Sequence, residues 1–357
     1  MEKKVVIFAT IATMVITITM ISLFLYFPDF HVLAVSMDEN WYTAVSSGES
    51  VLDLMRESSN AAEMTTVEED VEVEHELRLE LPGYVTSASV SVDNVYIDKT
   101  IYISIKGVGS NYIYDYPMMG KSDHIVDVTF SSVDATGIVG ITFDKVLEPQ
   151  MTVDDRYLYF DFLEPHEVYD YVVVVDAGHG GHVPGATKQG VSEKNIDLDI
   201  VLELKKLFDK SDENIGVYYT RVEDVNPSFD ARVGLANDSG ADLFISVHNN
   251  STASGRMSGI SGTEVMYKAT DETGASKAFA SSCLSHLLDE LGSKSKGTVV
   301  GDEIYIIRMS EVPVALVEVG FMTNQQELDL LTSKDYQKKA AKAMYDAIME
   351  TLYSVPR

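Results

Sequence analysis

Four acidic or imidazole side chains stand at positions where the sequence predicts that chemistry can be placed. His179, His248 and Glu318 each lie just past a short, strongly apolar run typical of a buried strand. These runs span residues 172–175, 243–247 and 314–317. Parallel strands end at a shared edge of their sheet, where the sites of open α/β proteins form. Glu193 opens the first predicted helix, in the turn that returns toward that edge.

Two imidazoles and a carboxylate are ligands that suit Zn²⁺. A catalytic zinc site has about three such N/O ligands and an open position for water. A further carboxylate then serves as general base and general acid, because it takes a proton from water and delivers it to a leaving nitrogen. Any one of the four side chains, taken alone, is more often structural than catalytic. Their shared placement at strand ends favours a site, although spacing alone does not identify the reaction.

The elements that position these side chains alternate between strand and helix from residue 171 onward. Ser192 is a good N-cap for a helix that continues to about Phe208. Further strands are expected at residues 215–219 and 263–267, and further helices at 232–237, 276–291 and 335–353. This alternation predicts an α/β catalytic domain over residues 171–357, with a mostly parallel sheet flanked by helices on both faces.

Residues 71–165 follow a different pattern, in which apolar and polar side chains alternate with a period of two. Leu77, Leu79 and Leu81 alternate with Arg78 and Glu80, and similar short runs follow between turns rich in glycine. This spacing predicts an all-β, sandwich-like accessory domain.

A run of tyrosines in this accessory domain has two interpretations. Tyr112, Tyr114 and Tyr116 alternate as they would along a strand and could form an aromatic face for a carbohydrate. Tyrosines in strands more often serve packing.

The N-terminal region reads as a membrane anchor and tether. Residues 1–4 would be a cytoplasmic stub, 5–27 an uncharged transmembrane anchor and 28–70 a tether. Lys3 and Lys4 precede the span, which places the N-terminus in the cytoplasm and the remainder outside. The expected localisation is therefore single-pass in the cell membrane with an extracytoplasmic catalytic domain. The alternative is secretion after cleavage near Ala34.

Composition excludes some function classes. The 357 residues include 56 acidic and 27 basic side chains, for a formal net charge of -29. Because nucleic-acid phosphates require a basic face, no nucleic-acid partner is expected. The single cysteine, Cys283, excludes an intramolecular disulfide and a cysteine-rich metal cluster. It falls in an apolar helical stripe and is expected to be a small core residue.

Residues 172–352 resemble the zinc-dependent N-acetylmuramoyl-L-alanine amidases of the third amidase family, which cut peptidoglycan. Five linked motifs carry the resemblance in order along about half of the chain. They are the segments 175–181 (VDAGHGG) and 190–194 (GVSEK), Thr220-Arg221 with Arg232 and Ala236-Asn237, 241–250 (ADLFISVHNN), and 306–308 (IIR) with 317–324 (VEVGFMTN).

The resemblance implies roles for individual residues. His179, Glu193 and His248 would be the ligands of Zn²⁺, and Glu318 would be the catalytic carboxylate. The reaction would be hydrolysis of the amide between N-acetylmuramic acid and L-alanine, for cell-wall remodelling. Arg308 is a candidate for binding a substrate carboxylate, with internal ion pairing as the alternative.

The remaining motif residues have supporting interpretations. Asn249 is a candidate for substrate binding or, like Asp176, for shaping the site from outside the ligand set. For Arg221 and Arg232, internal pairing is favoured over substrate binding.

Two other functions stay open at the level of sequence. One is a zinc peptidase that cleaves the stem peptide with the same metal chemistry, and the other is a wall-binding scaffold without catalysis. The intact set of four site residues argues against the scaffold. The expected partners are peptidoglycan and, through the N-terminal helix, the membrane, and a regulatory protein partner is left open.

Overall fold

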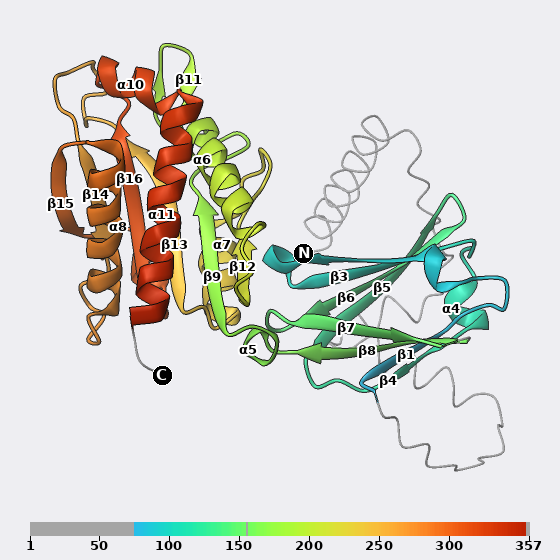
Figure 1. The fold of residues 1–357 in the computed structure, drawn as a ribbon. Helices are drawn as coiled ribbons and strands as arrows, with labels where there is room; N and C mark the ends of the chain where they lie inside the picture. Colours follow the sequence, from blue (N-terminus) through green and yellow to red (C-terminus); the bar gives the residue numbers. More distant parts are fainter. Residues whose placement is uncertain (1–74, 155, 355–357) are drawn as a thin grey trace, which may run out of the picture.

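The computed structural model describes residues 75–154 and 156–354, which form two domains side by side (Figure 1). The expected membrane anchor and tether, residues 5–70, lie outside the described residues. Within the described ranges, no helix has the length and apolar character that a membrane span requires.

The first domain is a sandwich of two four-stranded antiparallel sheets, as the alternating pattern predicted. The sheets have the strand orders β4-β1-β8-β7 and β2-β3-β6-β5. Successive strand side chains point to opposite faces, so the alternate apolar residues meet between the sheets. Leu79, Ile103, Ile141 and Phe160 are fully buried there. The strands are Leu77–Glu80 (β1), Val90–Val95 (β2), Thr100–Lys106 (β3), Met118–Gly120 (β4), Ile125–Val133 (β5), Thr136–Phe143 (β6), Glu148–Val153 (β7) and Tyr157–Leu163 (β8).

The run of three tyrosines is not a strand, which corrects the aromatic-face interpretation. Tyr112–Asp115 forms a short helix, α4. Tyr112 is buried in the sandwich core and donates its hydroxyl to the carbonyl of Glu80 at 2.6 Å. Tyr114 points to solvent. The helical turn sends the two side chains in different directions, so alternation in the sequence does not place them on one face.

The second domain contains a six-stranded sheet with the order β12-β9-β13-β16-β14-β15. All neighbouring strands are parallel except β14 and β16, so the expected mostly parallel sheet is confirmed. The four valines of β9 are fully buried, because helices cover both faces of a parallel sheet. The strands are Tyr171–Ala177 (β9), Ile215–Tyr219 (β12), Leu243–Asn250 (β13), Thr263–Tyr267 (β14), Ser295–Val300 (β15) and Val314–Phe321 (β16).

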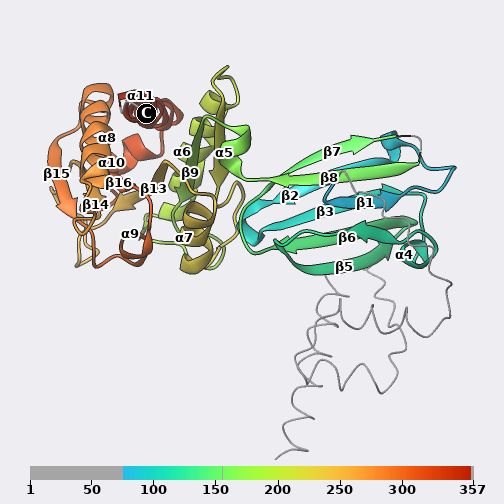
Figure 2. The ribbon, with the colours of Figure 1, turned by 90° about the horizontal axis from the view of Figure 1, so that it is seen from below.

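The helices are divided unequally between the two faces of this sheet (Figure 2). The long helices α6, α8 and α11 pack on one face over a large apolar cluster that includes Cys283, as expected for a core cysteine. The shorter helices α7 and α9 cover the other face. Their bounds are Glu193–Phe208 (α6), Phe229–Asp238 (α7), Ala275–Leu291 (α8), Tyr305–Met309 (α9) and Lys334–Ser354 (α11), and the short helices α5 and α10 span Pro165–Val168 and Gln325–Leu331.

The β-sandwich completes the apolar cluster on the α7 and α9 face. Val146 of the sandwich is fully buried in that cluster, and Tyr96 from the turn η2 (Tyr96–Asp98) packs against it. The rings of Tyr96 and Tyr218 lie 4.5 Å apart. Lys99 pairs with Asp238 at the end of α7, with 3.0 Å between Nζ and Oδ2. The two domains therefore pack against each other through a shared apolar cluster.

A buried carboxylate lies at this domain interface. Glu148 accepts hydrogen bonds from the hydroxyls of Tyr96 at 2.9 Å and Tyr218 at 2.5 Å, one tyrosine from each domain. Burial raises the pKa of Glu148 above its usual range, and the two tyrosine hydrogen bonds offset only part of this effect.

Replacing Glu148 by glutamine is expected to flatten the pH dependence of stability. An acid whose pKa is raised in the folded state favours folding at low pH, and this contribution is lost as the pH rises through the raised pKa. Because glutamine does not ionise, the melting temperature of Glu148→Gln should decline less than that of the wild type as the pH rises above the ordinary glutamate pKa of about 4.3. Differential scanning calorimetry measures this, with the exposed Glu272→Gln as control. Parallel curves for all three proteins would contradict it.

Candidate metal centre

Three neighbouring strands bring the predicted site residues to one edge of the sheet. His179 lies in the turn after β9, with a left-handed backbone φ of 58°. His248 and Glu318 are directly paired across β13 and β16. The sequence placed both residues just past their strands, whereas each strand continues beyond them to Asn250 and Phe321. The strand pairing therefore fixes the relative positions of His248 and Glu318.

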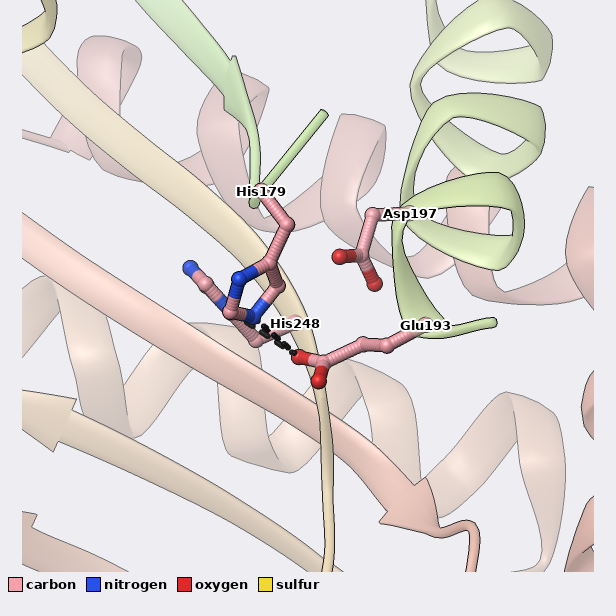
Figure 3. Close-up of side chains that lie close together, drawn as sticks. All are labelled: His179, Glu193, Asp197 and His248. Carbon is pink, nitrogen blue, oxygen red and sulfur yellow. Dashed lines mark hydrogen bonds and ion pairs between the residues drawn. The ribbon is translucent and has the colours of Figure 1, made fainter. Parts of the chain in front are cut away.

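Two imidazoles converge on one carboxylate oxygen at this edge (Figure 3). Glu193 is the first residue of α6, and its Oε1 lies 3.0 Å from Nε2 of His179 and 3.1 Å from Nδ1 of His248. The two imidazole rings are nearly perpendicular, with centroids 4.9 Å apart. One potential ligand atom from each of His179, Glu193, His248 and Asp197 lies within 4.8 Å of the others.

The chemistry of this donor set fits a divalent cation. Nitrogen and carboxylate oxygen are the ligands that zinc accepts. In the part of the chain that the structure describes, Glu318 Oε2 and Asp197 Oδ2 are buried without a hydrogen-bond partner. Buried acidic oxygens of this kind are costly unless a cation or a hydrogen bond compensates them.

Glycines let His179, Glu193 and His248 approach one another this closely. A Cβ on Gly185, whose φ is 66°, would lie 2.5 Å from Glu193 Oε2 and 2.6 Å from the ring of His179. A Cβ on Gly178 would collide with the ring of His248. Only residues without a side chain fit at these two positions, so the glycine-rich loop after β9 is part of the site's construction.

The carboxylates of the site differ in their protonation. Burial works to raise the pKa of Glu193, but hydrogen bonds and electrostatic attraction from His179 and His248 outweigh it and hold the pKa well below its usual range. Burial raises the pKa of Glu318 well above its usual range, with further increases from the charges of Glu193 and Glu264. Glu193 is therefore suited to neutralising the charge of a bound cation, and Glu318 is suited to carrying a proton.

Arg232 and Asp176 form a buried ion pair beneath the His179 loop. Arg232 Nη1 lies 2.5 Å from Asp176 Oδ1, and both side chains are at most 2% exposed. The hydroxyls of Thr220 and Ser246 also donate hydrogen bonds to the carboxylate of Asp176, each at 2.6 Å. Although burial raises the pKa of Asp176, Arg232 and these hydroxyls bring it below its usual range. Arg232 also donates to the backbone carbonyls of Ala177 and His179, so it holds the loop internally.

Arg221 links the loop after β9 to the start of α6. Its guanidinium donates to the carbonyls of Ala177 at 2.9 Å and Gly178 at 2.6 Å in the loop after β9. It also donates to the carbonyl of Lys194 at 2.9 Å, at the start of α6. Internal roles, which the sequence favoured for Arg221 and Arg232, thus account for the contacts of both residues.

The two candidate substrate-binding residues are placed very differently. Asn249 is buried, and its side-chain amide donates to Asp197 Oδ1 at 2.7 Å. A buried Asn249 that bonds to Asp197 fits the role of shaping the site better than the role of contacting substrate. Arg308 on α9 is exposed, and its guanidinium packs over the ring of Tyr305 and donates to the carbonyls of Asp302 and Glu303. These contacts leave its side chain open to solvent.

Asp197 is a residue of the cluster that sequence reasoning did not identify. It lies four residues after Glu193, and residues with this spacing share one face of a helix. An acidic pair at this spacing, on a helix whose other face-sharing residues are apolar, is the signal that could have identified it.

Comparison with known proteins places the second domain in a family. Residues 173–350 match the family Amidase_3, described as N-acetylmuramoyl-L-alanine amidase. The chain is 36% identical over 177 residues to YqiI of Bacillus subtilis, an uncharacterized protein. The aligned region covers 49% of this chain and 82% of YqiI. It is 32% identical over 174 residues to the N-acetylmuramoyl-L-alanine amidase LytC of the same organism.

The shared region is a fraction of some relatives. It covers 49% of this chain and 34% of LytC. The solved catalytic domain of CwlV, an N-acetylmuramoyl-L-alanine amidase from Bacillus (Paenibacillus) polymyxa, is 32% identical, with 50% of this chain and 97% of that chain covered and a TM-score of 0.47. The chain therefore belongs to the N-acetylmuramoyl-L-alanine amidase family, hydrolases that cleave the amide bond between N-acetylmuramic acid and L-alanine of peptidoglycan.

Proposed function

We propose that residues 171–354 hydrolyse this amide with the help of Zn²⁺, which His179, Glu193 and His248 hold, and with Glu318 as the catalytic carboxylate. The observation that carries the proposal is the convergence of two imidazole nitrogens, within 3.1 Å, on one oxygen of buried Glu193. Paired with His248 across two strands, Glu318 supplies the additional carboxylate that amide hydrolysis needs.

The three ligands divide the work of holding the cation. The imidazoles would bind it through ring nitrogens, and the carboxylate of Glu193 would supply negative charge. When bound, zinc would act as a Lewis acid that polarises the scissile carbonyl and makes water more acidic. Arg221 and Arg232 keep the His179 loop fixed relative to α6, so the ligands need little rearrangement.

Glu318 manages the proton that hydrolysis transfers. Its carboxylate accepts a proton from the attacking water and returns it to the departing nitrogen of L-alanine. Water is thereby consumed, and a lactyl carboxylate and a free peptide N-terminus are formed. The raised pKa of Glu318 supports both steps, because a more basic carboxylate removes a proton more readily and retains it until the amine leaves.

Digestion of purified cell wall by the full chain tests this proposal. We expect release of intact stem peptides, with lactyl carboxylates left on the glycan, as read by mass spectrometry. A chelator should abolish the release and added zinc should restore it, because the chelator removes the Lewis acid that the proposal requires and added zinc returns it. The same digestion with His179→Ala is the matched control, since it removes one imidazole and leaves Glu318 in place.

The products separate the proposal from the alternatives. Peptides cut within the stem would replace the amidase with a zinc peptidase. Zinc binding without release of any product would replace it with a wall-binding scaffold.

We also propose that residues 5–27 anchor the protein in the cell membrane with the catalytic domain outside. The uncharged span after Lys3 and Lys4 supports this orientation, and a substrate in the cell wall requires it. N-terminal sequencing of the membrane-bound protein should find Met1 or Glu2. A protein found only in the medium and beginning after Ala34 would replace the anchor with a cleaved signal.

A further inference from the structure

Asp197 is an acidic side chain beside the metal centre that the proposed reaction does not use. It is fully buried, one helical turn after Glu193 on α6. Figure 3 shows its carboxylate turned toward the space between Glu193 and His179. One of its oxygens lies within 4.8 Å of potential ligand atoms from the other three residues of the cluster.

Asn249 holds Glu193 and Asp197, two of the acidic side chains of α6, in one arrangement. Its side-chain amide donates to Asp197 Oδ1 at 2.7 Å, and its backbone N–H donates to Glu193 Oε1 at 3.2 Å. The single residue after His248 thus orients both carboxylates. With Oδ1 engaged, Asp197 has Oδ2 left, which is buried and has no hydrogen-bond partner among the described residues.

No described basic side chain bonds to this oxygen. The guanidinium of Arg221, whose positive charge acts on Asp197, directs its hydrogen bonds to the backbone carbonyls of Ala177, Gly178, Lys194 and Glu223. A buried carboxylate oxygen without a partner is strongly unfavourable, whereas a divalent cation at the centre of the cluster would compensate it.

We propose that Asp197 is a further protein ligand of the cation, through Oδ2. The proposal rests on the proposed function for the presence of the cation, and it enlarges the donor set from two nitrogens and one oxygen to two nitrogens and two oxygens. Zinc accepts five ligands, so a fourth ligand from the protein still leaves room for the reaction. The added carboxylate strengthens binding of the cation and raises its coordination number.

Zinc affinity of Asp197→Asn tests this role. Asparagine keeps the size of the side chain and removes its charge. Because the side-chain amide of Asn249 holds the oxygen at the Oδ1 position, asparagine would place its amide nitrogen at the Oδ2 position, and an amide nitrogen cannot serve as a ligand. We expect zinc binding by the full chain, measured by competition with a chelating dye, to weaken about 10- to 100-fold. Asp199→Asn is the matched control, because Asp199 lies on the same helix but pairs with Lys334 at 2.8 Å. Its affinity should equal that of the wild type.

Substitution of zinc by Co²⁺ gives a second measurement that does not depend on activity. Loss of a ligand lowers the coordination number, so the visible absorption of the Co²⁺ protein should become stronger in Asp197→Asn and stay unchanged in Asp199→Asn. A double variant, Asp197→Ala with Asn249→Ala, removes both side chains of the hydrogen bond between these residues. Neither partner is then left buried without the other. It should fold and show the same loss of affinity.

The outcomes distinguish this inference from the proposed function. Wild-type affinity and an unchanged Co²⁺ spectrum in both Asp197 variants would overturn the role of Asp197. If His179→Ala also bound zinc like the wild type, the metal centre itself, and with it the proposed function, would be overturned.

Discussion

Glu318→Gln is expected to lower the rate of amide hydrolysis by about 10²- to 10⁴-fold, the usual contribution of a general acid–base group. Glutamine has nearly the same size as glutamate, so the pairing of β16 with β13 is kept. It cannot take a proton from water or return one to the leaving nitrogen. Because residue 318 is outside the proposed ligand set, zinc affinity should stay within a few-fold of the wild-type value.

The control for this variant lies on the neighbouring strand. Glu264 is directly opposite Glu318 in the pairing of β14 with β16. Glu264→Gln therefore removes the same charge beside the site and leaves the proton carrier in place. Both variants should be tested by digestion of purified cell wall, with the products read by mass spectrometry, and by titration with zinc. If Glu318→Gln kept hydrolysis within tenfold of the wild type, another group would have to carry the proton.

Arg232→Met is expected to produce the largest loss of stability. Methionine keeps much of the volume but leaves Asp176 as a buried carboxylate without its cation. Breaking a buried ion pair on one side costs about 3–5 kcal/mol. The variant also removes the donors to the carbonyls of Ala177 and His179, so zinc should bind more weakly as well.

Urea unfolding of the metal-free protein measures the stability effect. Arg156→Met is the matched control, because Arg156 pairs with Glu80 at 2.6 Å but its side chain is 64% exposed. Exposed pairs contribute little, since water screens them and the side chains lose entropy. The prediction would fail if the two methionine variants had equal free energies of unfolding.

The sequence predicted the architecture well where the hydrophobic pattern was strong. The valines of β9 and the apolar runs of β13 and β16 identified three central strands, and their parallel order placed His179, His248 and Glu318 at one edge. The strand ends were less predictable, because polar residues such as His248 stay in the ladder when a neighbouring strand pairs with them.

Contacts between distant segments could not be predicted. The alternation of Tyr112 and Tyr114 looked like a strand, yet packing of one ring into the sandwich stabilises a helical turn. Asp197 falls within an ordinary amphipathic helix, and only the neighbouring Asn249 on another strand shows that its carboxylate is oriented. Such pairs depend on tertiary geometry rather than on local sequence.

Helix α7 gives the molecule a mechanical linkage between its two halves. Its first turn carries Arg232, which donates a hydrogen bond to the backbone carbonyl of His179. Its last residue, Asp238, forms an ion pair with Lys99 of the β-sandwich. A force that separates the sandwich from the catalytic domain therefore loads α7 at Asp238, while Arg232 near the other end of the same helix holds the loop of His179. One helix thus joins the accessory domain to a loop of the candidate site, so a displacement of the sandwich is transmitted to the backbone that carries His179.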